Sequence, residues 1–592
     1  MNTRVVAARL WVDWNFDGSF TQETTWLISA RGDMRLVPVG DGITSGRGIV
    51  SSMSLSLNNR AGRYSPLRVD GALYNYLLNG GAYQAPCHLE ISIDNQQSFQ
   101  RVFTGVIKLP RESALTWNRG AVATIEARST EEKLLNQRAS TLQTQFVDWH
   151  NNGATEAQII ADILAGASAA PTTIDAGVFA LPWVWLDDDS VAEQLWQIAG
   201  ATGGRYYVDP DGRHCYENFA HWQTAQRSLQ VQYRLTKDDY QNLDAWYEDK
   251  DLYSEIKIDV AVRDVAYSTK VWSHEQPVMI YPGSTEEIIA ELDQPLYAVE
   301  GITYIARTLG GTDASASIAV TPIYYAQRVK LTIQNTGTVL VAVAKLTIHG
   351  QLVEPDAPQT ITKTVTVDGD NGDYFTNRGI TRTRKISSQR IQTSAQAQSL
   401  AAFLLALSER PKLVFKINGL RGLPDLRLGD RIRIADSDWH YQNGLAGPSA
   451  TMMSGGGRTL GGALAIEDKP IIIGAGVTVT VTKTWTIQIN DQVGRTVSAN
   501  ETITDLVEHS SQTVSENGPV VIPTGVTVTV QDTWILYDIG HDAYVTAISW
   551  HYDASGFRQD IEAIAVNGLY PNDGNYFRLN IDTLGSARKV FF

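Results

Sequence analysis

The most informative part of the sequence runs from residue 53 to residue 66 and reads Met53-Ser54-Leu55-Ser56-Leu57-Asn58-Asn59-Arg60-Ala61-Gly62-Arg63-Tyr64-Ser65-Pro66. Three apolar residues, Met53, Leu55 and Leu57, alternate with serines, which is the period of a half-buried β-strand. Residues 58–62 end that strand, because Asn and Gly tolerate the left-handed backbone that a tight turn requires. Pro66 then cannot donate to a continuing ladder. The stretch predicts a strand that closes in a tight reversal.

The flanking sequence continues the β-pattern. Runs at residues 88–93, 101–107 and 121–127 predict three further strands. Upstream, Asp13-Trp14-Asn15-Phe16-Asp17-Gly18 predicts a short polar turn, and Gly46-Arg47-Gly48 comes shortly before the central strand. The N-terminal region is therefore expected to form a β-domain.

Taken in order, the turn at residues 13–18, the Gly-Arg-Gly triplet and the stretch from Leu57 to Pro66 resemble the N-terminus of bacteriophage tail-tip or baseplate hub proteins. In that family the chain begins with a tail-tube-like β-barrel. The resemblance implies two tail-tube-like β-barrels with short helices, so that three copies present six barrels to a sixfold tail tube. It covers residues 1–265, 380–440 and 540–592.

Composition narrows the class of protein. A chain of 592 residues is too long for one core and suggests about four domains. Hydrophobic residues at 43% and charged residues at 19% are typical of a folded globular chain. No apolar run is long enough to span a bilayer, and the N-terminus lacks the pattern of a secretion signal. The formal net charge of -15 argues against non-specific binding of nucleic acid. Cys87 and Cys215 are the only cysteines of the sequence, which is consistent with folding without disulfides.

The middle of the chain alternates between helical and strand patterns. Apolar spacing predicts helices over 154–165, with Thr155 as the N-cap, over 190–201 and over 394–408. Residues 205–216 predict a β-hairpin with Asp211-Gly212 in its turn, which resembles the piece that opens the second tube-like domain of the family. Residues 243–262, in which 252–260 alternate, are expected to add a strand to that domain. Val-, Thr- and Ile-rich sequence from 269 to 373 predicts a small β-sandwich.

The C-terminal region contains an internal repeat. The pattern from Pro470 to Trp485 recurs from Pro519 to Trp534 at an offset of 49 residues throughout. Alternating Val and Thr predicts strands with one apolar face, which would stack as short β-arches. Because residues 430–434 and 544–552 resemble consecutive strands of one barrel, the repeats are interpreted as an insertion, with the glycine-rich residues 444–462 as its hinge.

The expected fold is mainly β with minor α+β character. Its predicted domains are a first tail-tube-like barrel (1–150), a helical linker with the start of the second tube-like domain (151–268), a β-sandwich (269–380), a helix and strands completing the barrels (381–440), an inserted β-repeat module (441–539) and final barrel strands with a C-terminal segment (540–592).

Three patterns could carry binding chemistry. Asp13, Asn15 and Asp17 resemble the start of a calcium loop, but Thr24 stands where the closing Glu is expected, with Glu23 one residue early; the alternative is a polar hairpin turn. His214, Cys215, Glu217 and His221 could surround a metal, although neighbours on a strand face opposite sides. Arg31-Gly32-Asp33 matches a cell-adhesion tripeptide that also arises by chance.

No catalytic signature is evident. The sequence lacks His-Glu-x-x-His, Gly-x-Ser-x-Gly and a suitable Cys pattern, and the acidic run Asp187-Asp188-Asp189 is best explained by the positive end of the helix that follows. We therefore expect no enzyme activity, and we nominate no catalytic, cofactor-binding or metal-binding residue.

The resemblance implies a structural virion protein, a homotrimeric hub that joins and closes the tail tube and forms part of the DNA-ejection conduit. Expected partners are the tail tube or distal tail protein ring, the tape-measure protein and a tip or fibre protein. DNA would pass through the lumen without specific binding. The location would be the virion tail, assembled in the host cytoplasm. One alternative is a host-glycan-binding adhesin or fibre-attachment protein, with Trp485 and Trp534 as exposed receptor residues; another is an acidic glycosidase, for which no carboxylate pair stands out.

Overall fold

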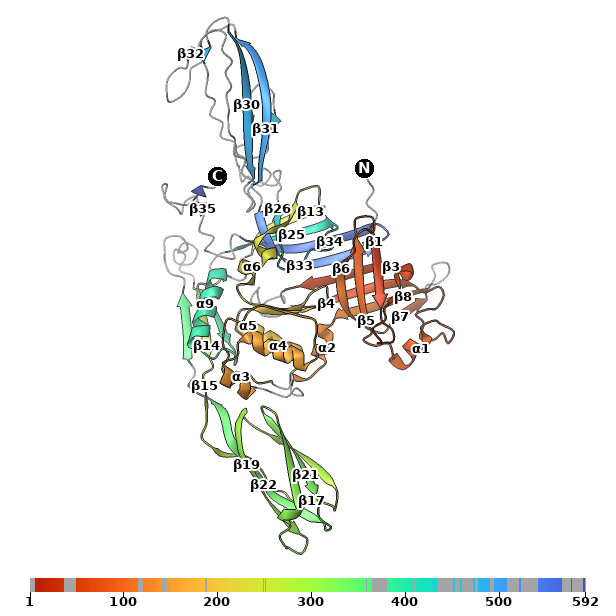
Figure 1. Cartoon of the computed structure of the whole chain (residues 1–592), viewed down its shortest axis with the longest axis vertical. Helices are drawn as coiled ribbons and strands as arrows, with labels where there is room; N and C mark the ends of the chain where they lie inside the picture. The colour runs from red at the N-terminus through yellow and green to blue at the C-terminus, as the bar shows by residue number, and fades with distance from the viewer. Residues whose placement is uncertain are drawn as a thin grey trace.

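The structure of the chain is a computed structural model. It describes residues 6–36, 49–114, 121–139, 146–186, 189–248, 250, 252–357, 359–364, 381–408, 411–434 and 541–566. It also gives the backbone of short strands at 451–452, 458–459, 472–473, 477–489, 495–507, 521–522, 576–577 and 589–590. As expected, the fold is mainly β, with short helices and several separate sheets (Figure 1).

The largest sheet has fourteen strands and joins sequence from both ends of the chain. We call its first part the N-terminal half-sheet: β1 (Ala7–Val12), β2 (Thr21–Gln22), β3 (Leu27–Arg35), β4 (Ile49–Asn58), β5 (Pro86–Ser92), β6 (Gln100–Ile107), β7 (Arg111–Ala114) and β8 (Ala121–Ser129). The C-terminal half-sheet contains β12 (Val231–Leu235), β13 (Asn242–Glu248), β25 (Lys412–Arg421), β26 (Arg431–Ile434), β33 (His541–Asp553) and β34 (Gly556–Ala565).

The predicted pair of closed barrels is corrected by this topology. In the described part of the chain, the strands run in the open order β13-β25-β34-β33-β3-β4-β8-β6-β5-β1-β2, with β7, β12 and β26 at the sides. β3 pairs with β4 on one edge and with β33 on the other. The edge that could close the N-terminal half-sheet on itself is thus used to join the other half-sheet.

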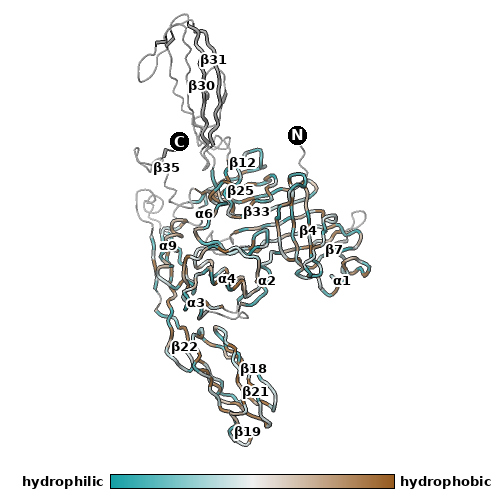
Figure 2. Tube along the Cα trace, in the orientation of Figure 1, coloured by the Kyte–Doolittle hydropathy of each residue, from teal (hydrophilic) through white to brown (hydrophobic). Residues whose placement is uncertain are grey.

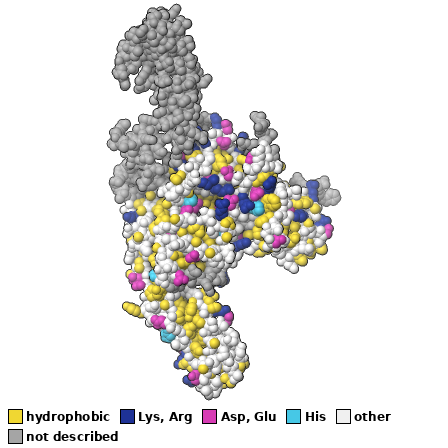
Figure 3. All heavy atoms as spheres, viewed as in Figure 1, with side chains coloured by type: hydrophobic (Ala, Val, Ile, Leu, Met, Phe, Trp, Pro, Cys, Tyr) yellow, Lys and Arg dark blue, Asp and Glu magenta, His cyan; other side chains and the backbone are white. Residues whose placement is uncertain are grey.

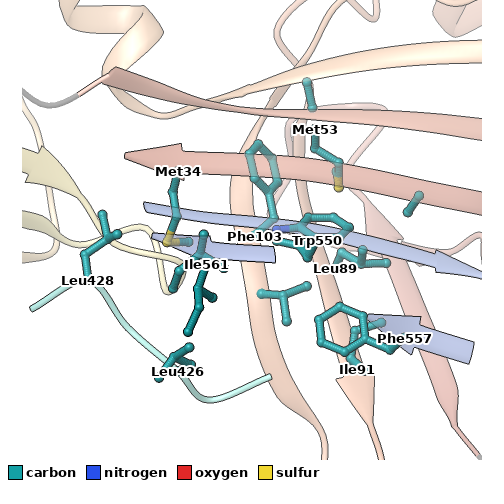
Figure 4. Close-up of a cluster of buried hydrophobic side chains, with 14 of the residues drawn as sticks. Met34, Met53, Leu89, Ile91, Phe103, Leu426, Leu428, Trp550, Phe557 and Ile561 are labelled. Carbon is teal, nitrogen blue, oxygen red and sulfur yellow. The ribbon is translucent and has the colours of Figure 1, made fainter. Parts of the chain in front are cut away.

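Both half-sheets share one hydrophobic core. Figure 4 shows Met34, Met53, Leu89 and Phe103 of the N-terminal half-sheet packed with Trp550, Phe557 and Ile561 of β33 and β34. Hydrophobic and hydrophilic residues alternate along these strands, as Figure 2 shows, because successive side chains of a strand face opposite sides. The common core explains why the two halves form one body.

A compact α/β unit lies beside the sheet. It contains α2 (Glu131–Leu135), α3 (Phe146–Asn152), α4 (Glu156–Gly166), α5 (Val191–Ala201) and the strands β9 (Thr172–Ile174), β10 (Arg205–Val208) and β11 (His214–Glu217). The predicted helices and the Asp-Gly hairpin are all present. Thr155 precedes α4, where its backbone N–H donates to Gln158 Oε1 at 2.9 Å. Ser190 caps α5 by accepting from the Glu193 N–H at 3.2 Å.

The predicted β-sandwich projects from this unit (Figure 1). One sheet contains β15 (Arg263–Val265), β16 (Thr269–His274), β17 (Val278–Ile280), β19 (Leu296–Thr308) and β22 (Val341–Pro355), and the other contains β18 (Thr285–Glu291), β20 (Ile318–Tyr324) and β21 (Arg328–Asn335). Its base is held by stacked rings, since His150 lies 3.6 Å from Trp183 between ring centroids and Tyr297 of β19 contacts both.

The region predicted to add a strand, residues 243–262, contains two strands: β13 joins the C-terminal half-sheet, but the alternating part does not. Within residues 252–260, the strand β14 (Glu255–Val260) pairs with β23 (Gln359–Thr364) and β24 (Thr383–Ser387) and does not join the half-sheets. The helix α9 (Ser394–Ser408) covers it, so Ile256 and Ile258 are buried against Leu400 and Leu404. Alternation identifies a two-faced strand, but it does not say which helix or strand completes the layer.

Shorter elements complete the description. They are α1 (Tyr74–Leu77), α6 (His221–Thr224), α7 (Gln226–Leu229), the 3-10 turns η1 (Thr24–Trp26), η2 (Leu78–Gly80) and η4 (Ser315–Ser317), and the strands β27 (Thr451–Met452), β28 (Arg458–Thr459), β29 (Ile472–Ile473), β30 (Val477–Ile489), β31 (Arg495–Val507), β32 (Val521–Ile522), β35 (Tyr576–Phe577) and β36 (Lys589–Val590). No helix in the described part of the chain is long and apolar enough to cross a membrane.

The two copies of the repeat meet in the structure. β29 pairs in parallel with β32, joining Ile472 to Val521 and Ile473 to Ile522, which are equivalent positions at the offset of 49 residues. The Val-Thr run of the first copy forms β30, which pairs with β31. The Val-Thr run of the second copy lies outside the described residues.

Candidate assembly interface

The two half-sheets share a strand order that the sequence does not reveal. β3, β4, β5, β6 and β8 follow one another along the chain and lie in the sheet as β3-β4-β8-β6-β5, with antiparallel neighbours throughout. β13, β25, β26, β33 and β34 also follow in chain order and lie as β13-β25-β34-β33-β26, again antiparallel. The chain thus contains the same five-strand arrangement twice.

The two copies differ at the sixth strand. β1 lies beside β5 and runs antiparallel to it, whereas β12 lies beside β26 and runs parallel. The equivalence therefore holds for five strands, and the sixth position is filled in a different way in each half.

A single strand pair joins the two halves edge to edge. β3 and β33 run antiparallel, with partners from Ala30 opposite Tyr552 to Arg35 opposite Ala547. The Leu36 N–H extends this ladder by donating to Thr546 O at 2.9 Å. Arg35 Nη2 lies 3.1 Å from Glu562 Oε1 across the junction. The junction is a continuous antiparallel ladder and not a looser packing of side chains.

Gly32 allows the closest approach at this junction. A Cβ built there would lie 2.6 Å from Trp550 Cε2 and 2.9 Å from the carbonyl oxygen of Ser52. Gly32 is the middle residue of the Arg31-Gly32-Asp33 tripeptide, which lies in β3 with paired strands on both sides rather than in a loop. The packing of Trp550 accounts for this glycine without any adhesion role.

A buried carboxylate fixes the start of the N-terminal half-sheet. Glu23 is fully buried and accepts hydrogen bonds from Trp14 Nε1 at 2.9 Å, from Tyr64 Oη at 2.7 Å and from two guanidinium nitrogens of Arg63, the shorter at 2.6 Å. The hydrogen bond to Glu23 raises the pKa of Arg63, and burial raises that of Tyr64. We call this group of four residues the Glu23 clasp.

The rest of the turn motif supports the same clasp. Asn59 Oδ1 accepts from the Tyr64 N–H at 2.9 Å, and Asn59 Nδ2 donates to Glu112 Oε1 at 3.0 Å. Gly62 has φ +67, where a Cβ would clash with the Arg68 side chain. The stretch from Asn58 to Tyr64 therefore closes β4 and holds it against the first turn, whereas Gly46-Arg47-Gly48 lie outside the described residues.

The geometry of the first turn fits the polar hairpin turn, which is the alternative to a calcium loop. Asp13 accepts the backbone N–H of Asp17 at 3.3 Å and that of Gly18 at 3.0 Å, so both its carboxylate oxygens are engaged in the turn. Glu23, the nearest candidate for the closing ligand, belongs to the clasp. The polar hairpin turn accounts for the sequence, and the signal that reveals the clasp is the Arg63-Tyr64 pair, forty residues downstream.

The other group of candidate ligands, His214, Cys215, Glu217 and His221, is divided between two networks. The His214 ring contacts Tyr206 Oη at 2.6 Å, and burial lowers the pKa of His214 to about 4. His221 instead lies between two carboxylates, with Nδ1 2.7 Å from Asp175 and Nε2 3.2 Å from Glu217. Cys215 Sγ contacts the Arg213 carbonyl oxygen at 3.4 Å.

The network around Glu217 is an internal salt-bridge cluster. Glu217 also binds Arg205 and the Tyr207 hydroxyl, and the Arg205 guanidinium lies over Trp222 at 4.1 Å from the ring centroid. Burial raises the pKa of the Asp175 carboxyl, but the hydrogen bond and charge of His221, the Asn218 N–H and the charge of Arg205 together outweigh it, and the net shift is downward. Trp222 belongs to the core of the half-sheets, so the cluster ties the α/β unit to that core.

The remaining candidates do not assemble a site in the described residues. Within those ranges, no three His, Cys, Asp or Glu side chains come together as metal ligands. Asp189 Oδ2 accepts from Gln194 and Gln197 of α5 at 3.3 Å, whereas Asp187 and Asp188 lie outside the described residues. Both cysteines are free and buried, and burial raises the pKa of Cys87 to about 12. Trp485 lies in β30, and Trp534 is outside the described residues.

On the face drawn in Figure 3, Lys and Arg side chains gather near the middle, with Asp and Glu side chains among them. Several arginines of the described residues pair with carboxylates, as Arg227 Nη2 does with Asp430 at 2.6 Å and Arg101 Nη2 with Glu90 at 3.6 Å. Phosphate binding by clustered cations is not favoured by such pairing.

Comparisons with known proteins add little beyond likeness. No family model matches the chain, and no curated protein matches it in sequence. The chain is similar to the crystal structure of a tail protein from Neisseria meningitidis MC58, with 10% identity, 95% of this chain and 98% of that one covered, and a TM-score of 0.42. It is also similar to the 43 kDa tail protein of prophage MuSo2 from Shewanella oneidensis, with 8% identity over 94% and 98% of the two chains and a TM-score of 0.40. The prophage tail protein gp18 from Listeria monocytogenes EGD-e is also similar, with 7% identity over 94% of each chain and a TM-score of 0.35. With TM-scores below 0.5, these likenesses establish neither a common fold nor a common function.

Proposed function

We propose that this chain is a structural protein of a bacteriophage tail, and that three copies form a hub that closes the distal end of the tail tube. One observation carries the proposal: the chain holds two half-sheets of the same five-strand order, already paired edge to edge through β3 and β33. Three such chains supply six half-sheets, the number that a sixfold tube needs.

The sequence resemblance supports the same role. Three of the residues that carry the resemblance, Trp14, Arg63 and Tyr64, bind Glu23 in the clasp, so they help to fix the geometry of the N-terminal half-sheet. The role is structural rather than catalytic.

The proposed partners follow from this position. The half-sheets would face the tail tube or a distal tail protein ring, the tape-measure protein would lie in the lumen, and a tip or fibre protein would attach below. The net charge of -15 suits a conduit, because an acidic wall repels DNA and lets it pass without specific binding. The projecting β-sandwich and the insertion between β26 and β33 are available for fibres or neighbouring proteins.

Light scattering on the purified chain, followed by negative-stain averaging of the same sample, tests the proposal. A mass of three chains and a ring with a central channel is the expected result. A stable monomer that forms no ring, alone or with tail tube protein added, would contradict it. A monomer that binds host glycans would favour the alternative of a tail-tip adhesin.

A further inference from the structure

We propose that the open edge of β13 in one copy pairs with the open edge of β7 in the next copy, repeating between chains the junction that β3 and β33 make within one chain. This inference rests on the proposed hub and assigns the strands that join its copies. It follows from the duplicated strand order. β3 and β33 pair with each other within one chain, whereas the equivalent strands of the other half, β13 and β7, each have an edge with no partner strand among the described residues.

The first step is the edge of β33 that receives β3. Along one side β33 pairs with β34. Along the other side its beginning, from His541 to Tyr544, pairs with β26, and its remainder pairs with β3. The part of β33 that β26 does not cover is therefore the part that pairs with β3.

The second step finds the same stretch in the N-terminal half-sheet. β6 and β7 together take the place of β33, because both pair with β8 on one side. β5 pairs with β6 from Gln100 to Val106 and does not extend to β7. The edge of β7 away from β8 therefore corresponds to the part of β33 that receives β3, and the structure shows no partner strand there among the described residues.

The third step identifies the strand that would fill it. β13 corresponds to β3, since each lies at the outer end of its half and pairs antiparallel with the next strand, β25 or β4. The outer edge of β3 is paired with β33, whereas β13 is paired with β25 alone in the described part of the chain. Figure 1 places β13 and β7 in different parts of the body, so one chain cannot bring them together.

The surfaces of the two strands suit a contact between copies. Trp246 is 40% exposed and Tyr247 is 70% exposed on β13, and large aromatic side chains of this kind are enriched in protein interfaces. Asp244 on β13 and Arg111 on β7 are both exposed and carry opposite charges. An unpaired edge strand is also a ready template for another strand.

The geometry of such a contact is head to tail. β13 of one copy meets β7 of the next, so every copy uses two different surfaces. All of these surfaces are paired only when the copies close into a ring. The intrachain junction would then alternate with the interchain junction around the ring. Three copies contain three junctions of each kind.

Disulfide trapping tests the assignment. A variant with both Asp244→Cys and Arg111→Cys is oxidised mildly and compared with each single variant and with the unchanged chain, whose two cysteines are buried. The double variant is expected to give disulfide-linked dimers and trimers on a non-reducing gel, and the other three chains to remain monomeric. Arg111→Cys combined with Thr321→Cys, on an exposed position of β20, is the matched control and should give none.

A second variant separates this inference from the proposed function. Trp246→Lys with Tyr247→Lys changes only exposed side chains and is expected to reduce the mass in solution from three chains to one without loss of β-sheet circular dichroism. If the unchanged chain is trimeric but neither variant behaves as expected, the strand assignment is wrong and the hub stands. If the unchanged chain is monomeric yet the double cysteine variant is trapped specifically, the strand assignment holds for a weak contact. If there is neither oligomer nor trapping, both are overturned.

Discussion

The N-terminal and C-terminal half-sheets have the same five-strand order but are assembled from very different lengths of chain. The first is contiguous, from β3 to β8 within residues 27–129, whereas the second is collected from residues 242–248, 412–434 and 541–565. Between β13 and β25 lie the β-sandwich and the α9 layer, and between β26 and β33 lie the repeats. The N-terminal half-sheet is uninterrupted, whereas the C-terminal half-sheet has the same strand order with additional modules inserted between its strands.

The halves also differ in the buried charges that hold them. The N-terminal half has the Glu23 clasp, in which one buried carboxylate accepts from Trp14, Arg63 and Tyr64. In the C-terminal half, Arg431 and Arg433 of β26 both bind Asp542 of β33. Each half therefore depends on a partly or fully buried ion pair whose members come from separate strands or turns.

The largest expected effect is the loss of the clasp. Glu23→Ala removes the acceptor of all these donors and leaves the Arg63 charge, which is only 19% exposed, without its partner. We expect a loss of about 3–5 kcal/mol, confined to the N-terminal half-sheet. Amide hydrogen exchange should show faster exchange in β1 and β4 but not in β25. Asp70→Ala, which breaks the solvent-screened pair with Arg68, is the control and should leave stability almost unchanged. Equal effects of the two variants would contradict the role of the clasp.

The next effect concerns the junction between the halves. Gly32→Ala places a Cβ against Trp550 and against the Ser52 backbone, and overpacking of this kind costs about 1–3 kcal/mol. Exchange should increase in β3 and β33 together, because they share one ladder. Gly301→Ala in β19, where the new Cβ would have open space, should leave both unchanged. Faster exchange in β3 alone would mean that the ladder is not the element that joins the halves.

A smaller effect is expected from pH. Burial lowers the pKa of His88, in β5, to about 4. The unfolded chain, with an ordinary pKa of about 6.5, therefore binds the proton first on acidification, so stability is complete above about pH 6.5 and declines as pH falls toward about 4. Between about pH 7 and about pH 5.5 the loss should be on the order of 1 kcal/mol. Melting curves of His88→Gln should lack this part of the slope, whereas His551→Gln, on an exposed position of β33, should keep it. A slope that His88→Gln leaves unchanged would assign it to other groups.

The smallest effect is expected from removing the insertion. Ile434 and His541 are partners in the β26–β33 ladder, so a loop of about four residues can replace residues 435–540 and close an ordinary hairpin. The melting temperature of the body should change by less than about 3 °C. A large fall would mean that the inserted residues support the sheet, and the comparison of the two halves would lose its basis.

Local patterns in the sequence predict local structure well in this chain. The helix over 394–408 and the hairpin with Asp211-Gly212 are present as expected, because apolar spacing and turn chemistry act over a few residues. Partners are harder to predict. The alternation of Glu255–Val260 shows a strand, but its neighbours β23 and β24 come from residues a hundred positions or more further on. The duplicated order is hidden for the same reason, since only paired strands reveal it.

The candidate interface is equally hard to predict. Arg63 and Tyr64 stand out in the sequence, but the sequence around their acceptor, Glu23, resembles only an imperfect calcium loop. Gly32 stands out only as part of a tripeptide, whereas the structure explains it by Trp550, more than five hundred residues away. Short motifs indicate that a residue matters, while the contact that makes it matter depends on the completed sheet.

The pairing of β3 with β33 also means that β3 must wait for its partner during synthesis of the chain. β3 leaves the ribosome early, and its partner strand begins only at residue 541. At about 5–20 residues per second, β3 waits for about 25–100 s with one edge unpaired. During that interval nascent chains on one messenger lie close together, and an open strand edge can pair with a neighbour. Slower translation of the C-terminal region or a crowded polysome should therefore increase aggregation of this protein even though the finished fold is unchanged.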